Sequence, residues 1–255
     1  MNDRERALNS PNHPLLKHYV KLAEQRKYRE ETGSFIVTGH KLVEAIPEDW
    51  TIRHVIVEEG KRTEDIPIPK GVEIIRCPQS WLRKITGQQQ PEGIAAEIAL
   101  PNQQFPSPLR RLLVLDGVAD PGNLGTLQRS ALAFGWQGIF LLPGCCDPLN
   151  PKVVRSAMGA TFLLPTLSGS WQELNSLLKS AGLALWAADA AGGSAESMDR
   201  GGPIALCLGS ESHGLSPETR ERLTHLVGLP IAPVVESLNV AVAGGILLYL
   251  LGAQR

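Results

Sequence analysis

The chain has no excess of charge of either sign and few cysteines, and each shortage excludes a class of protein. Its 255 residues include 25 Lys and Arg against 26 Asp and Glu, so the net charge is -1. A protein coated with basic residues for nucleic acid is excluded, although a local basic patch is not. The four cysteines form no C-x-x-C pair and no zinc spacing with histidine, which favours free thiols in a reducing compartment and no bound metal.

Long apolar segments are also absent. The longest apolar run, residues 240–253, has 14 residues, whereas about 20 are needed to span a bilayer. The first residues carry charges where a signal peptide needs an apolar stretch. Hydrophobic residues make up 43% of the chain, which is typical of a globular protein with a core. We therefore expect a soluble, cytoplasmic protein without a membrane partner.

The chain divides near residue 105. Residues 101–108 contain three prolines and no charged residue between two apolar stretches, which indicates a linker. We predict one domain over residues 1–100, a linker over 101–109 and a second domain over 110–255. In both domains strand-like runs alternate with helical ones. This alternation favours an α/β fold with a mostly parallel sheet covered on both faces.

The individual elements follow from apolar periodicity and end signals. Short apolar runs predict strands at residues 35–37, 52–57, 72–75, 112–115, 139–142, 183–188 and 204–208. Helices are predicted from Leu15, Leu124, Asn150, Ser170, Ser216 and Val240. The helix at 170–181 opens with the capping box Ser170-x-x-Glu173. The helix at 240–251 is apolar on nearly every side, so we expect it to be buried in a core or against a second subunit.

The first of three glycine-rich turns spans residues 115–129. Motifs of dinucleotide, P-loop, serine-hydrolase and zinc-protease sites are absent, so these turns are the candidates for a binding site. Glycines at a strand-to-helix junction let backbone N–H groups approach a ligand. If the helix starts near Asn123, Arg129 lies six residues on and on a different face. The alternative is that Asn123 caps the helix and Arg129 is a solvated side chain.

The second turn leads into a helix over residues 150–160. Lys152 and Arg155 are three residues apart on one face of this helix and could contact a phosphate. Two ordinary surface cations are the alternative. The neighbouring Cys145 and Cys146 are interpreted as loop or buried thiols rather than a redox pair.

The third turn covers residues 208–216. Its Glu211 stands beside glycines, which a solvated glutamate does not need, whereas His213 is typical of a loop histidine. Further along, Ser237 and Asn239 stand just before the apolar helix. Capping that helix is the alternative to a functional role for both.

Together the three turns resemble the SpoU/TrmH family of RNA ribose 2′-O-methyltransferases, within the SPOUT superfamily. The resemblance rests on D-P-x-N-x-G-x-x-x-R at Asp120–Arg129, on N-P-x-x-V-R at Asn150–Arg155, and on G-x-E-x-x-G-L-S with S-L-N-V-A-V-A within Gly209–Ala243. The first part of the chain is similar to the small substrate-binding domain that often precedes this catalytic domain. Residues 233–236 depart from the glycine- and serine-rich lead-in of many members.

The resemblance implies a fold, a cofactor and an assembly. It implies a C-terminal trefoil knot, which is an exception to the rule against knots. It places S-adenosylmethionine in the knot loops, at positions that match Gly209, Leu229 and Leu238. It implies a homodimer through the catalytic domain, with the site at the subunit interface. The family's active-site positions match Asn123, Arg129, Glu211, Ser237 and Asn239.

The arginine of that set is often assigned as the base in the family. A guanidinium is effectively always protonated, so we favour a role for Arg129 in positioning a phosphate and stabilising charge on the 2′-oxygen. Ser237 and Asn239 could orient the ribose or Arg129. Glu211 could hold the arginine or a ligand hydroxyl.

RNA binding must come from local patches, because the net charge is close to zero. Between His13 and Arg29 a single anion accompanies five cations, which are Lys17, Lys21, Arg26, Lys27 and Arg29. With Tyr19 and Tyr28 among them, this stretch suits an RNA backbone and a stacked base. A solvated helix face followed by a turn is the alternative.

The sequence therefore predicts an S-adenosylmethionine-dependent RNA 2′-O-ribose methyltransferase, with ribosomal RNA as the preferred substrate. Transfer RNA is the near alternative. A non-catalytic RNA-binding assembly factor with the same fold is the second alternative, and the presence of all five active-site positions argues against it.

Overall fold

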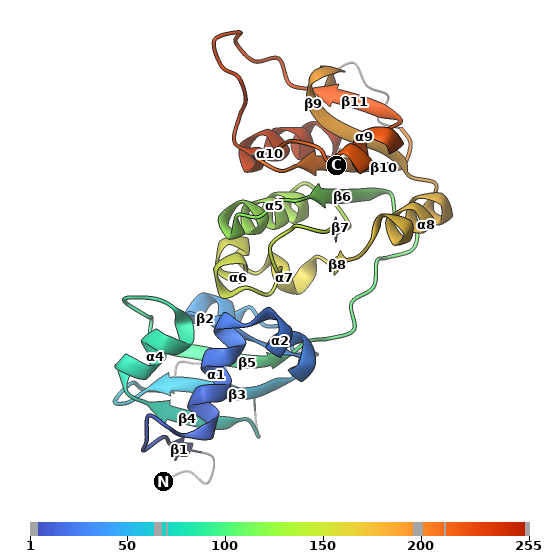
Figure 1. The fold of residues 1–255 in the computed structure, drawn as a ribbon. Helices are drawn as coiled ribbons and strands as arrows, with labels where there is room; N and C mark the ends of the chain where they lie inside the picture. Colours follow the sequence, from blue (N-terminus) through green and yellow to red (C-terminus); the bar gives the residue numbers. More distant parts are fainter. Residues whose placement is uncertain (1–4, 64–67, 70, 196–200, 212, 253–255) are drawn as a thin grey trace. The chain divides into compact units, whose positions relative to one another are not determined.

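The computed structural model describes residues 5–63, 68–69, 71–195, 201–211 and 213–252, and the chain forms two compact units (Figure 1). The first unit comprises Met1–Asn102 and Leu149–Phe162, and the second comprises Gln103–Pro148 and Leu163–Arg255. Residues 101–109, the predicted linker, contain no helix or strand. Residues 149–162 pack in the first unit, although their place in the sequence suggested the second domain.

The first unit is built on a mixed sheet of five strands. Its strand order is β1 (Glu5–Ala7), β4 (Glu73–Cys77), β3 (Ile52–Glu58), β5 (Ile94–Ala99) and β2 (Ser34–Thr38). The β1–β4 and β4–β3 pairs are parallel, whereas β5 runs antiparallel to both of its neighbours. The sheet of this unit is therefore mixed, because β5, which apolar periodicity did not predict, runs antiparallel; the predicted mostly parallel sheet is that of the second unit.

Helices cover both faces of this sheet. Consecutive strand residues point to opposite faces, so Ile36 packs with Tyr19 and Leu82 while Phe35 packs with Val154. The helices of the first unit are α1 (Pro14–Glu24), α2 (Arg26–Thr32), α3 (His40–Glu44), α4 (Gln79–Thr86) and α6 (Pro151–Ala157). Helix α6 therefore completes the core on one face of the first unit.

The second unit has a fully parallel sheet of six strands. Its order is β11 (His225–Gly228), β9 (Ala184–Ser194), β10 (Ile204–Gly209), β6 (Arg111–Asp116), β7 (Gly138–Leu141) and β8 (Thr166–Ser168). From β6 the chain adds β7 and β8 on one side and later strands on the other. Such a reversal of strand order is where open parallel sheets place ligand sites, at the carboxyl ends of the strands.

The helices of the second unit confirm most of the predicted starts and stops. They are α5 (Pro121–Ala133), α8 (Trp171–Ala181), α9 (Pro217–Arg222) and α10 (Val240–Leu251), with the short α7 (Ala160–Leu163) at the unit boundary. The capping box of α8 is present, and Gly182 ends that helix in a left-handed conformation. Helix α5 begins earlier than expected, because Asp120 and not Asn123 caps it.

Helix α10 packs against α5 and β10 on one side. A Cβ at its Gly244 would lie 2.5 Å from the Leu127 side chain, so glycine permits this close approach. On another side Val242, Ile246 and Tyr249 are exposed by 52%, 41% and 68%. Part of the apolar helix is thus uncovered within a single chain. Among the residues described, no helix reaches the length and hydropathy that crossing a bilayer requires.

Candidate active site

A cavity of about 520 Å³ lies beside the middle of β9 and at the carboxyl ends of β10 and β11 in the second unit. Its walls come from Ala188–Ala190, from the segment that follows β10, and from residues 227–247. Six of the predicted site residues line it: Gly209, Glu211, Leu229, Ser237, Leu238 and Asn239. The structure thus brings together positions that are up to 30 residues apart in sequence.

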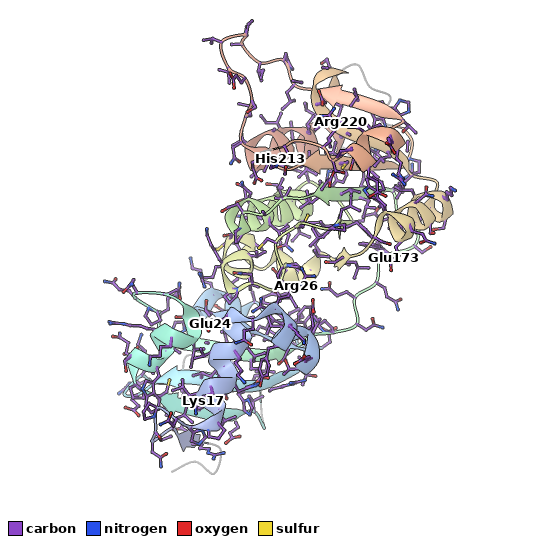
Figure 2. The ribbon with its side chains drawn as sticks, viewed as in Figure 1. Lys17, Glu24, Arg26, Glu173, His213 and Arg220 are labelled. Atoms are coloured by element: carbon purple, nitrogen blue, oxygen red, sulfur yellow. The ribbon has the colours of Figure 1, made fainter. Side chains whose placement is uncertain are left out.

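The turn after β10 is a tight structure that leaves no room for side chains at its base. Ser210 and Gly214 exchange two backbone hydrogen bonds of 2.9 Å each. A Cβ at Gly209 would lie 2.3 Å from the Gly214 carbonyl carbon, so the backbone itself forms the cavity wall there. Glu211 extends from this turn and is exposed. His213, which is labelled in Figure 2, is exposed as well and is not among the cavity residues.

A chain of hydrogen bonds links three separate segments beside the cavity. Asn239 caps α10 by accepting from the N–H groups of Ala241 (2.8 Å) and Val242 (3.3 Å). Its Nδ2 donates to Asn123 Oδ1 at 3.2 Å. Asn123 Nδ2 in turn donates to Glu211 Oε1 at 2.5 Å. The capping role expected as an alternative for Asn239 is therefore real, and it coexists with a place in this polar chain.

Arg129 does not join the cavity of its own chain. It lies on α5, six residues beyond Asn123, and its side chain is exposed. It is not among the residues that line the cavity. Arg129 and Asn123 both lie within the α-helix Pro121–Ala133, where a separation of six residues places them on different faces, as predicted.

Two acidic residues that line the cavity belong to no sequence motif and were not predicted as site residues. Asp189 lies in β9; its Oδ1 accepts from Ala191 N–H at 3.0 Å, and its Oδ2 pairs with Arg220 at 3.2 Å. Glu236 lies in the segment before α10. The position of Asp189, just after the predicted strand at 183–188, is the signal that could have identified it.

The basic stretch of the first unit is only partly a surface patch. Lys17 and Lys21 are exposed on α1, and Arg26 and Lys27 on α2; Figure 2 marks Lys17 and Arg26. Arg26 pairs with Glu30 at 2.8 Å and Lys27 with Glu31 at 3.7 Å, which lowers the net positive charge of this face.

Arg29 and Tyr19 do not belong to that surface, so their inclusion in the predicted RNA patch is wrong. Arg29 is 3% exposed, and its Nη1 donates to the carbonyls of Leu22 and Ala23 at 2.5 and 3.2 Å. It therefore joins α2 to the end of α1. Tyr19 is fully buried, and burial raises the pKa of its hydroxyl. Tyr28 stays partly exposed, with Lys21 Nζ 5.3 Å from its ring centroid.

The two cations of α6 differ in the same way. Lys152 is exposed, after an Asn150 side chain that caps the helix as predicted. Arg155 is partly buried and donates to the Thr86 carbonyl at 3.1 Å, and burial lowers the pKa of its guanidinium. Arg155 thus connects α6 with α4 inside the first unit.

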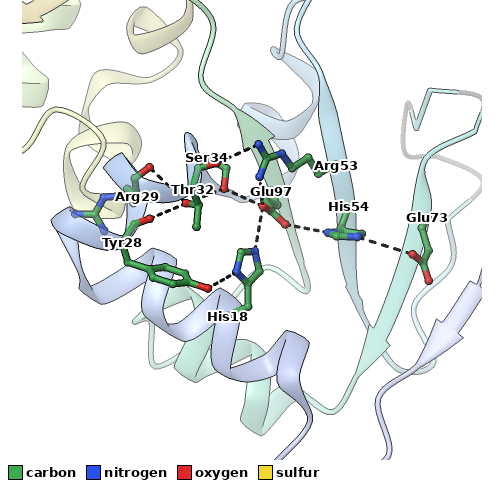
Figure 3. Close-up of polar contacts among 9 residues, drawn as sticks. All are labelled: His18, Tyr28, Arg29, Thr32, Ser34, Arg53, His54, Glu73 and Glu97. Atoms are coloured by element: carbon green, nitrogen blue, oxygen red, sulfur yellow. Dashed lines mark hydrogen bonds and ion pairs between the residues drawn. The ribbon is translucent and has the colours of Figure 1, made fainter.

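A buried carboxylate organises the centre of the first unit (Figure 3). Glu97 on β5 is 1% exposed. Its Oε1 lies 3.1 Å from His18 Nε2 and accepts from Ser34 Oγ at 2.9 Å, and its Oε2 accepts from His54 Nδ1 at 2.9 Å. His18 Nδ1 also bonds to the Tyr28 hydroxyl at 2.9 Å. Although burial opposes ionisation, these histidine and serine hydrogen bonds hold the pKa of Glu97 well below its usual value.

Comparisons with known proteins match nearly the whole chain to RNA methyltransferases and their substrate-binding domains. Residues 110–249 match the SpoU rRNA methylase family, and residues 13–96 match the MRM3-like substrate binding domain. An uncharacterized tRNA/rRNA methyltransferase of Synechocystis sp. is 36% identical over 95% of this chain and 92% of its own length. The 23S rRNA (guanosine(2553)-2′-O)-methyltransferase RlmP of Bacillus subtilis is 29% identical over 95% of this chain and 97% of its own.

The comparison with solved structures also finds an RNA methyltransferase. A crystal structure of an AdoMet-bound rRNA methyltransferase from Sinorhizobium meliloti has a TM-score of 0.84 to this chain, with 28% sequence identity. The similarity covers 97% of each chain. Both units therefore have counterparts in that protein.

Proposed function

The chain belongs to the SpoU rRNA methylase family, and we propose that it transfers a methyl group from S-adenosylmethionine to a ribose 2′-hydroxyl of ribosomal RNA. The observation that carries this proposal is the cavity beside β9 and at the carboxyl ends of β10 and β11. It gathers the residues at the family's cofactor positions, and the Asn123–Glu211–Asn239 chain stands beside it.

The cavity suits S-adenosylmethionine in its volume, its apolar lining and its charge. Its volume is within the range of about 300–1,000 Å³ that small-molecule sites occupy. Apolar side chains for the adenine ring come from Leu208, Leu229, Ile231 and Leu247. Carboxylates suited to the sulfonium and ammonium charges come from Asp189 and Glu236. When it is bound, S-adenosylmethionine supplies an electrophilic methyl group.

The residues of the polar chain orient the reacting ribose. Glu211 gives one carboxylate oxygen to Asn123, and its other oxygen is the acceptor we assign to a ligand hydroxyl. Asn239 is held by the first turn of α10. The side-chain amide of Asn123 is therefore fixed by Asn239 at its oxygen and by Glu211 at its nitrogen. A preset hydrogen-bonding group lowers the cost of aligning the 2′-hydroxyl for transfer. Ser237, exposed at the cavity, supplies a further hydroxyl for the ribose.

We propose that Arg129 of one chain contributes to the active site of a second copy of the chain. Its guanidinium stays protonated and would neutralise a phosphate or the charge that develops on the 2′-oxygen. Because Arg129 does not line its own cavity, we assign it to a site completed at a homodimer interface. The exposed apolar face of α10, formed by Val242, Ile246 and Tyr249, is the surface that a second copy would cover.

The first unit supplies the contact with RNA in this scheme. Lys17, Lys21, Arg26 and Lys27 on α1 and α2, with Lys152 on α6, are the exposed cations we assign to the phosphate backbone. Tyr28 is the ring we assign to base stacking. We also propose the C-terminal trefoil knot of the family. The four free cysteines support a cytoplasmic location.

The test is methyl transfer from labelled S-adenosylmethionine to separate pools of unmodified ribosomal and transfer RNA. We expect label in ribosomal RNA at a linkage that resists alkali, since 2′-O-methylation removes the hydroxyl that attacks the phosphate. Arg129→Ala should abolish the label, whereas Arg222→Ala, which changes an exposed arginine outside the cofactor cavity, should not.

Each other outcome selects a different function. Label in transfer RNA alone would replace the substrate assignment and keep the chemistry. Cofactor binding without label in either pool would contradict both RNA assignments. Absence of cofactor binding would favour a non-catalytic RNA-binding role.

A further inference from the structure

Asp116 is a buried carboxylate beside the cofactor cavity that the proposed mechanism does not use. It ends β6, it is 6% exposed, and it does not line the cavity. Its Oδ2 accepts from the Ser216 N–H at 2.8 Å and from the hydroxyl of Thr219. Thr219 is fully buried, so its hydroxyl has no access to water as an alternative partner.

Both ends of the turn that carries Glu211 meet this one residue. At the start of the turn, Gly209 is the partner of Asp116 in the parallel pairing of β10 with β6. At the end of the turn, Ser216 binds the Asp116 carboxylate and caps α9. Between these points the Ser210–Gly214 bridge closes the turn. Asp116 therefore holds the start of the turn through its backbone pairing and the end of the turn through its carboxylate.

Asp116 also begins the segment that leads to Asn123. The next residue, Gly117, has a φ of +74°, and a Cβ there would lie 3.5 Å from the Ser210 side chain. The turn after β6 and the turn after β10 therefore lie close together at their bases. The 2.5 Å bond between Asn123 and Glu211 joins them again further out. A shift of either turn would break this bond.

We infer that Asp116, acting through Thr219, is a positioning residue for the cofactor site: it holds the turn at 209–216 so that Gly209 and Glu211 face the cavity. The inference rests on the proposed function of that cavity. Loss of the Thr219 hydroxyl leaves the Asp116 carboxylate buried with one charged hydrogen bond fewer. The turn then gains freedom, and cofactor binding must restore its order.

The test compares Thr219→Val, which keeps the shape and removes the hydroxyl, with Thr219→Ser, which keeps the hydroxyl. Binding of S-adenosylmethionine is measured by calorimetry on the full chain, well below the unfolding temperature. We expect Thr219→Val to weaken binding by about tenfold or more, the size of one hydrogen bond to a charged group. Thr219→Ser should bind within about threefold of the native chain, since it restores that hydrogen bond.

Two controls separate positioning from general stability. Glu218→Gln changes the neighbouring exposed residue of α9 and should leave the dissociation constant unchanged. RNA affinity, measured on the same samples, should stay the same in Thr219→Val. Equal cofactor affinity in Thr219→Val and the native chain would overturn the inference, even if the unfolding temperature falls. If the native chain itself binds no S-adenosylmethionine, the proposed function fails and the inference fails with it.

Discussion

The two units each contain a polar network around a glutamate, and the networks differ in burial. In the first unit, Glu97 is 1% exposed and its partners His18, Ser34 and His54 come from three surrounding elements. In the second unit, Glu211 is exposed and is held by Asn123 at the rim of a cavity. Removing one partner of a buried, paired carboxylate is destabilising, whereas an exposed carboxylate is accessible to a ligand. Burial therefore separates the enclosed Glu97 from Glu211, to which we assign a role in the proposed site.

The sheets of the two units show a second contrast. The parallel sheet of the second unit brings the carboxyl ends of β10 and β11 to one edge, where the segments that follow them form a cavity with the middle of β9. In the first unit the antiparallel β5 lies between β2 and β3, and its Glu97 side chain is enclosed by α1 and the sheet. The second unit therefore has a sheet edge suited to a ligand site. The first unit offers the surfaces of its helices, to which we assign the RNA contacts.

The largest expected effect is on the stability of the first unit, and it concerns residues 149–162, which pack in that unit. Phe162 is 6% exposed and packs against Trp50 with ring centroids 5.4 Å apart. Phe162→Ala should lower the free energy of unfolding of the first unit by about 3–5 kcal/mol, the usual cost of removing a buried ring. Urea unfolding followed by tryptophan fluorescence measures it. The neighbouring Leu163→Ala, at a side chain that is 65% exposed, is the control and should change little.

The next prediction concerns the buried network of the first unit. Glu97→Gln removes the charge that His18, Ser34 and His54 donate to, and should lower the free energy of unfolding by about 2 kcal/mol. Glu73→Gln is the matched control, because Glu73 is 42% exposed and lies 3.8 Å from His54. Cofactor binding should not change in either variant. Equal destabilisation by both would contradict the assignment of Glu97 as the centre of the network.

The same network predicts a pH dependence. Because the pKa of Glu97 is lowered in the folded state, its contribution to stability is present above the ordinary glutamate pKa of about 4.3. That contribution is lost as the pH falls below this value toward the folded-state pKa. The stability difference between the native chain and Glu97→Gln should therefore shrink between pH 5 and about pH 3. Urea unfolding at several pH values would show it, and a constant difference would contradict it.

A smaller effect, on activity alone, is expected at the exposed network of the second unit. Asn123→Ala removes the amide between Glu211 and Asn239 and should reduce methyl transfer by about ten- to a hundredfold. The free energy of unfolding should change by less than about 1 kcal/mol, since the group is partly exposed. Thr126→Ala, on the same helix, is the control. A large loss of stability in Asn123→Ala would remove the contrast between the two networks.

The smallest effect is expected at the surface of α1 and α2. Reversing Lys21 and Lys27 to Glu should weaken RNA binding about tenfold near physiological salt and leave S-adenosylmethionine binding intact. The dependence of RNA affinity on salt should become shallower, because fewer phosphate contacts release counterions. The double change Lys41→Glu with Arg62→Glu reverses as much charge elsewhere in the first unit. Equal loss of RNA affinity in both pairs would show that charge alone, rather than this surface, determines binding.

The sequence by itself determined most local features of this protein. The strands at 52–57, 112–115 and 204–208 and the capping box of α8 follow from apolar period and end signals, which depend on neighbouring residues. The glycine-rich turns were identified because glycine spacing is itself local information. The same motifs pointed to the cavity residues at the carboxyl ends of the strands.

The tertiary structure decided which polar residues are paired and which are available. Arg29 has the sequence context of a surface cation, yet the carbonyls at the end of α1 bind it in the interior. Residues 149–162 lie between segments of the second unit in sequence, yet Val154 and Phe162 complete the core of the first. Asn123 and Glu211 are 88 residues apart and meet at 2.5 Å. Such contacts depend on strand order and on burial, and no local period in a sequence encodes either.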